Sequence, residues 1–144
     1  MAGAPFLYFD RSLGKALPEA LRILRVPNVV HHHTPPGLIG LPKKRGQSGL
    51  FAKGAPDDEW LSFVSARNWV SFSQDYKMHL EEAPLDAIKQ HKARVFYLWG
   101  SDVTRWEKMR GFARAYGAII EASSQPGPFV WRVTQAGKLQ SIAI

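Results

Sequence analysis

Short apolar segments that recur along the chain restrict its fold more than any other feature of the sequence. Four of them are expected to form strands, at residues 5–9 (PFLYF), 26–32 (VPNVVHH), 69–73 (WVSFS) and 95–99 (VFYLW). The first is almost wholly apolar, which is typical of a strand buried on both faces. Strands of that kind occur in parallel sheets whose two faces are covered by helices. The pattern therefore favours an α/β fold with a mainly parallel central sheet.

Segments with helical spacing lie between these strands. We expect one helix around residues 17–24, a second that begins at Asp57, a third that begins at Pro84 and a long fourth after Thr104. Thr104 and Glu107 have the spacing of a capping box, in which hydroxyl and carboxylate satisfy each other's helix-end amides. The apolar positions expected to face the core from these helices are Leu17, Leu21, Ile23, Leu24, Trp60, Leu61, Val64, Trp106, Met109, Ala113 and Tyr116.

Two further strands are expected near the C-terminus. The segments PFVWRV and KLQSIAI flank TQAG within residues 128–144, which predicts a terminal β-hairpin. Such a hairpin would allow a homodimer by pairing across a dimer edge. A length of 144 residues without an internal repeat suits a single domain over residues 1–144.

Residues 34–56 differ from the rest of the chain. They are rich in Gly and Pro, carry the cations Lys43, Lys44 and Arg45, and show neither helical nor strand periodicity. The segment is therefore expected to be a long loop inserted in the domain. Two interpretations remain open: a solvated insertion without a role, and a basic arm that contacts phosphates, with Leu50 and Phe51 as its anchors.

Composition excludes several kinds of protein. Cysteine does not occur, which excludes disulfides, thiolate metal ligands and a cysteine nucleophile. No apolar run approaches the roughly 18 residues of a membrane span, and the N-terminus does not resemble a signal peptide, so a cytoplasmic protein is expected. The formal net charge of +7 favours polyanionic partners such as RNA or DNA.

Three acidic positions follow or precede the predicted strands in a consistent way. Asp10 and Asp75 come just after two strands, and Asp57 begins the helix that leads into the second of them. Ligands of open parallel sheets bind at the carboxyl ends of strands, so these side chains are expected to converge. Carboxylates are the oxygen ligands of Mg²⁺ or Mn²⁺, and such an ion activates water against phosphate esters. Taken singly, each acid also suits a helix cap or a turn.

Basic and aromatic residues near the acids invite further hypotheses. Lys77 and His79 follow Asp75 closely and would contact substrate phosphate, although a solvated surface position explains them equally well. His31, His32 and His33 are adjacent in a strand, where neighbours point to opposite faces, so the three cannot chelate one ion. A His33 that faces the acids would still complete the site or contact phosphate.

Four segments carry a resemblance to a known family: FLYFDRSLG, PDDEWLSFVSARNWVSFSQDYK, ARVFYLWG and PGPFVWRVTQAGKL. They resemble PIN-like domains, most closely the VapC45-type PIN-like toxins, which are related to Mut7-C-like domains. The resemblance implies a three-layer fold and a Mg²⁺- or Mn²⁺-dependent ribonuclease, often the toxin partner of a cognate antitoxin. Its motifs assign metal binding and catalysis to Asp10, Asp57 and Asp75, and supporting roles to Asp58, Glu59 and Ser73.

The sequence also departs from the family pattern. A fourth acid usually lies between the first acid and the one that begins the helix, but residues 11–56 hold only Glu19, within the predicted helix, and then the histidines and the basic loop. This departure leaves a second hypothesis, a PIN-like module that binds nucleic acid or an antitoxin without efficient hydrolysis.

Overall fold

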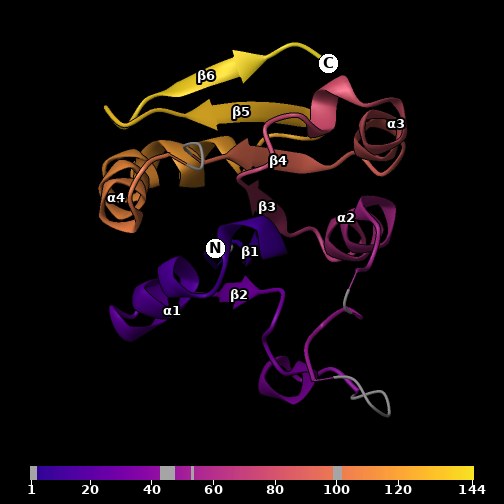
Figure 1. Ribbon diagram of the computed structural model, residues 1–144, viewed down its shortest axis with the longest axis horizontal. Coiled ribbons are helices and arrows are strands. Elements are labelled where there is room, and N and C mark those ends of the chain that lie inside the picture. Colours follow the sequence, from indigo (N-terminus) through magenta and orange to yellow (C-terminus); the bar gives the residue numbers. More distant parts are fainter. Residues whose placement is uncertain (1–2, 43–47, 53, 99–101) are drawn as a thin grey trace.

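The fold is built on one six-stranded sheet. The computed structural model describes residues 3–42, 48–52, 54–98 and 102–144. The strands are β1 (Leu7–Phe9), β2 (Val29–His31), β3 (Val70–Ser73), β4 (Arg94–Tyr97), β5 (Phe129–Val133) and β6 (Leu139–Ile142). Their order in the sheet is β2-β1-β3-β4-β5-β6, parallel throughout except that β6 runs antiparallel to β5 (Figure 1). The prediction of a mainly parallel α/β sheet with a C-terminal hairpin is confirmed.

Helices cover both faces of the sheet. They are α1 (Ala16–Ile23), α2 (Asp57–Ala66), α3 (Glu82–Gln90) and α4 (Arg105–Ala122). α1 and α4 lie on one side, and α2 and α3 lie on the other (Figure 1). Because strand side chains alternate between faces, Tyr8 packs among α2 and α3 while Leu7 and Phe9 pack among α1 and α4. The three layers expected for the fold are therefore present. No helix in the described ranges is long and apolar enough to cross a membrane.

A row of stacked phenylalanines aligns the middle of the sheet. Phe9 of β1, Phe72 of β3 and Phe96 of β4 occupy matching positions in the ladder. The ring centroids of Phe9 and Phe72 lie 4.8 Å apart and those of Phe72 and Phe96 lie 5.2 Å apart, nearly parallel in both pairs. Phe112 of α4 covers the row at an angle. These contacts favour a single register, because a slip of one residue would turn each ring to the opposite face.

Two expectations for the apolar helix faces are wrong. The buried residues of α4 are Gly111, Phe112, Ala115 and Ile119. Of the residues expected to face the core, Met109 and Tyr116 are partly buried against it, whereas Trp106 is 67% exposed and Ala113 is also exposed. At 3.6 residues per turn, Trp106 lies about 120° round the helix from Phe112. The C-terminal end of α1 differs in the same way, since Ile23 and Leu24 are 79% and 67% exposed. Helical spacing alone does not tell which of two apolar lines meets the sheet.

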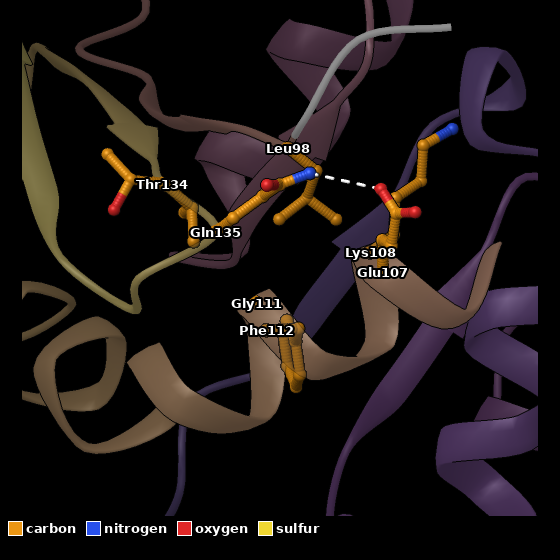
Figure 2. Close-up of a pocket in the computed structure, with 8 residues that line it drawn as sticks. Leu98, Glu107, Lys108, Gly111, Phe112, Thr134 and Gln135 are labelled. Carbon is orange, nitrogen blue, oxygen red and sulfur yellow. Dashed lines mark hydrogen bonds between the residues drawn. The ribbon is translucent and has the colours of Figure 1, made fainter. Parts of the chain in front are cut away.

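The hairpin turn packs directly on α4 (Figure 2). Gln135 Nε2 donates to Glu107 Oε2 at 3.1 Å, while the amide of Glu107 donates to Thr104 Oγ1 at 3.1 Å. The hydroxyl half of the predicted capping box is therefore present, and the Glu107 carboxylate bonds the hairpin instead. The gap between these residues measures about 10 Å³, no more than one water would fill. It is a packing contact and not a ligand site.

Part of the segment 34–56 belongs to the core. It contains a short 3₁₀ helix, η2 (Pro36–Ile39), and Leu50 and Phe51 are each only 6% exposed. The amide of Leu50 donates to the carbonyl of His32 at 3.1 Å. The ring of Phe51 lies 5.8 Å from Tyr8 and 5.0 Å from Phe63, edge-on to both. The segment is thus anchored between the sheet and α2 by these two residues.

This anchoring predicts a stability effect unusual for a loop residue. Phe51→Ala should lower the free energy of unfolding by about 3 kcal/mol, because it removes a buried ring and leaves a cavity against Tyr8 and Phe63. Leu38→Ala, in the same segment but 63% exposed, is the matched control and should change stability by less than about 0.5 kcal/mol. Urea unfolding followed by circular dichroism measures both. Equal small losses would show that the segment is not part of the core.

Candidate functional site

Three strands bring polar residues to the same edge of the sheet. Asp10 follows β1, His32 follows β2, and Asp75 lies two residues beyond β3. The chain winds in opposite directions from β1 and β3, so this edge is the switch point at which α/β sheets open a ligand site. A cavity of about 110 Å³, here called the acid cavity, is lined by Asp10, Arg11, Ser12, His32, Ala55, Asp57, Trp60 and Asp75. The structure thus places Asp10, Asp57 and Asp75 around one cavity.

Asp10 is held by a serine that also binds β3. Its Oδ1 accepts from the Ser12 amide at 2.8 Å and from the Ser12 hydroxyl. The same Ser12 Oγ lies 3.3 Å from Ser73 Oγ and accepts from the Gln74 amide at 2.9 Å. Ser12 was not singled out in the sequence, although a hydroxyl two residues after an aspartate is a common turn signal. It connects the ends of the two central strands.

The charge of Asp10 is poorly compensated. The side chain is 6% exposed, and this burial raises the pKa of its carboxyl to about 6, with a smaller contribution from the neighbouring charge of Asp57. Hydrogen bonds from Ser12 and Ser73 act in the opposite direction but do not offset the burial. A buried carboxylate beside a second carboxylate favours the binding of a cation.

Asp57 and Asp75 each have one oxygen in a local hydrogen bond. Asp57, the first residue of α2, accepts from Trp60 Nε1 at 2.9 Å through Oδ1. Asp75 accepts from the Lys77 amide at 3.3 Å through Oδ1, and its own amide donates to Ser73 Oγ at 3.0 Å. The Ser73 hydroxyl therefore orients the backbone at Asp75.

The donor atoms suit a hard divalent cation, but they lie too far apart to form a complete set of direct ligands around one ion. Three carboxylates and two hydroxyls surround the acid cavity or its wall, and such oxygens are the ligands that Mg²⁺ and Mn²⁺ take. Outside residues 1–2, 43–47, 53 and 99–101, however, no three His, Asp or Glu side chains are close enough together to hold one ion. The site offers the right chemistry without three direct protein ligands.

Comparison with known proteins identifies the family. Residues 5–100, well over half of the chain, match a family described as PIN like domain. The chain belongs to the PIN-like domain family. All three acids of the acid cavity lie within the matched range, whereas α4 and the hairpin lie beyond it. Searches of curated proteins and of solved structures found no match.

His32, and not His33, faces the acids of this PIN-like domain. His32 lines the acid cavity, and its Nδ1 lies 3.2 Å from the Tyr8 hydroxyl. Burial lowers the pKa of His32 to about 4, helped by the charges of His33 and Arg11, so its ring is neutral at pH 7. His33 is exposed, and His31 contacts Glu19 at 3.3 Å. The three histidines therefore do not share one site, as their adjacency in a strand predicted, and His32 is the one that lines the acid cavity.

Asp58, Glu59, Lys77 and His79, also proposed from the sequence, do not line the acid cavity. Asp58 pairs with His91 at 3.0 Å, and Glu59 is exposed beside the 50–52 segment. Lys77 is exposed near the rim, and His79 bonds the Tyr97 hydroxyl. Lys43, Lys44 and Arg45 fall outside the residues that the structure describes.

The buried Asp10 predicts a pH-dependent stability in the absence of divalent ions. Its pKa is about 6 in the folded protein and near 4 in the unfolded chain, so the folded state holds more protons between those pH values. Stability contributed by this group is therefore lost as pH rises from about 4 to 6, by roughly 2–3 kcal/mol. Asp10→Asn should unfold at higher urea than wild type at pH 8 in EDTA, and the difference should vanish near pH 4.

A control separates this titration from the change in net charge. Asp86→Asn removes one exposed carboxylate on α3 that does not line the acid cavity, and should show no such pH-dependent gain. A constant difference between Asp10→Asn and wild type at all pH values would contradict the assigned burial of Asp10.

Proposed function

We propose that this PIN-like domain is a ribonuclease that uses Mg²⁺ or Mn²⁺ to hydrolyse RNA phosphodiester bonds. The observation that carries the proposal is that Asp10, Asp57 and Asp75 come from three separate segments and line one cavity of about 110 Å³. Family membership supports nuclease-type chemistry. The surrounding chain carries a formal net charge of +7, which attracts a polyanionic substrate.

Each acid has a role in this proposal. Asp10, Asp57 and Asp75 would hold the cation partly through its own waters, because the described part of the chain does not bring three direct ligands together and Mg²⁺ keeps several waters when bound. The bound ion would supply Lewis-acid stabilisation of the phosphate and an activated water. Ser12 and Ser73 fix the positions of Asp10 and of the backbone at Asp75, so the carboxylates need little reorganisation.

Basic side chains would grip the RNA backbone. Arg11 lines the acid cavity, and Lys77 is exposed two residues beyond Asp75, where each would contact a phosphate. Lys43, Lys44 and Arg45 are proposed as further phosphate contacts on the strength of their charge and their place in a segment anchored near His32. The resemblance to VapC45-type toxins supports a role as the toxin of a pair, with a cognate antitoxin as partner.

The proposal predicts loss of cleavage when a single carboxylate becomes an amide. Asp75→Asn should lower the cleavage rate of single-stranded RNA by on the order of 100-fold, because one of the groups that stabilise the cation and transition state is lost. Asp75 is exposed, so the change should leave the fold intact. Gel assays in Mg²⁺, in Mn²⁺ and in EDTA measure the effect, with Asp86→Asn as the control that should cleave like wild type. Equal cleavage by wild type and Asp75→Asn would exclude the proposed role.

A second function is favoured by the spacing of the acids. Without three direct ligands in the described ranges, and with no further acid between Glu19 and Asp57, the domain would bind RNA or an antitoxin with weak or no hydrolysis. In that case RNA affinity should fall linearly on logarithmic axes as salt increases, with no product formed in Mn²⁺. Metal-dependent product formation would exclude this second function.

A further inference from the structure

A second cavity opens beside the acid cavity on the same edge of the sheet. It measures about 360 Å³, within the range of roughly 300–1,000 Å³ typical of small-molecule sites. Tyr76, His79, Tyr97, Leu98, Asp102 and Arg132 contribute to its lining, and it is here called the aromatic cavity. These residues come from the segment after β3, the end of β4 and its continuation, and β5.

Neighbouring residues of the chain line the two cavities. Asp75 lines the acid cavity and the next residue, Tyr76, lines the aromatic cavity. Burial raises the pKa of the Tyr97 hydroxyl, and the negative charges of Asp75 and Asp10 raise it further. Tyr97 therefore lies within electrostatic range of the acids. A ligand that reached both cavities would place its charged part at the acids and an adjoining part among the aromatic rings.

The aromatic residues of this cavity differ in their contacts: Tyr97 and His79 are hydrogen-bonded to each other, whereas Tyr76 is exposed. The Tyr97 hydroxyl lies 3.1 Å from His79 Nδ1 and accepts from the His79 amide at 3.1 Å, and the two rings lie 5.5 Å apart. Tyr76, in contrast, is 55% exposed, with the Lys77 ammonium 5.9 Å from its ring centroid. An exposed tyrosine next to Asp75 of the acid cavity offers a stacking surface to a planar ligand.

We propose that the aromatic cavity binds one unpaired nucleobase of a single-stranded RNA whose adjoining phosphate lies at the acid cavity. The inference rests on the proposed function and names the form of its substrate. The base stacks on Tyr76, while the Asp102 carboxylate is available to accept from a ring N–H or amino group. Bases in a duplex are already stacked and paired, so only an unpaired or extruded base enters.

Affinity for short RNA tests the proposal in the Asp10→Asn background, in which the proposed function predicts that cleavage is strongly reduced. Tyr76→Ala should weaken the binding of a single-stranded hexanucleotide, measured by fluorescence anisotropy, roughly 5- to 150-fold, the effect of losing one stacked base. Tyr76→Phe keeps the ring and should bind like the parent. Trp106→Ala removes an aromatic ring that is 67% exposed on α4 and lines neither cavity, so it should also have no effect.

An abasic series locates the contact on the RNA. One abasic position in the hexanucleotide should weaken binding to the parent as much as Tyr76→Ala does, and the variant should not weaken that RNA further. Equal affinity of the parent and Tyr76→Ala for every RNA overturns the aromatic cavity as a base site, while cleavage by the wild-type chain keeps the ribonuclease proposal. The reverse result, base-dependent binding through Tyr76 with no cleavage in either metal ion, overturns only the ribonuclease. If the wild-type chain neither binds nor cleaves RNA, both proposals are overturned.

Discussion

The stack of Phe9, Phe72 and Phe96 is the interaction on which the rest of the structure depends. It joins the three central strands through nearly parallel rings that lie about 5 Å apart. Because the rings sit at matching ladder positions, they favour one register for β1, β3 and β4. Asp10 follows Phe9 directly, and Ser73 follows Phe72, so the same register puts the acid and the serine side by side. The apolar core on the α4 side thereby determines the geometry of the polar edge.

The burial of Asp10 at the polar edge lowers the stability of the folded state, and the packing of the apolar core has to compensate for this loss. Asp10 is buried with its charge largely unopposed, and His32, also in the cavity wall, remains neutral and provides no positive charge. Hydrogen bonds made by Ser12 connect Asp10 with the end of β3. A site that is destabilising in its empty form is common where a protein binds a cation or an anionic transition state. The buried rings and the anchor at Phe51 offset that cost.

Local patterns in the sequence predicted most of the fold and the outline of the site. Compact apolar runs identified the strands, and the acids at their ends identified the edge on which they meet. The predictions that failed concern which face of a helix or strand packs against the rest of the fold. Trp106 and Leu24 belong to apolar lines that the helices turn away from the sheet, and nothing in helical spacing distinguishes those lines from the buried ones. His32 lines the cavity, but adjacent strand residues point to opposite faces, and the run of three histidines does not tell which of those faces meets the acids. Ser12 matters through contacts with β3, sixty residues away in the chain, which no local pattern contains.

The position of the Ser12 hydroxyl bears on ion selectivity. One oxygen atom contacts the Asp10 carboxylate, the Ser73 hydroxyl and the Gln74 amide, so the separation between the first acid and the backbone before Asp75 is set within the protein itself. An ion that bound there would have to fit an opening already fixed by hydrogen bonds. The cation preferred would then be the one whose size matches that opening, so discrimination among divalent ions would depend on the serine that positions the acids.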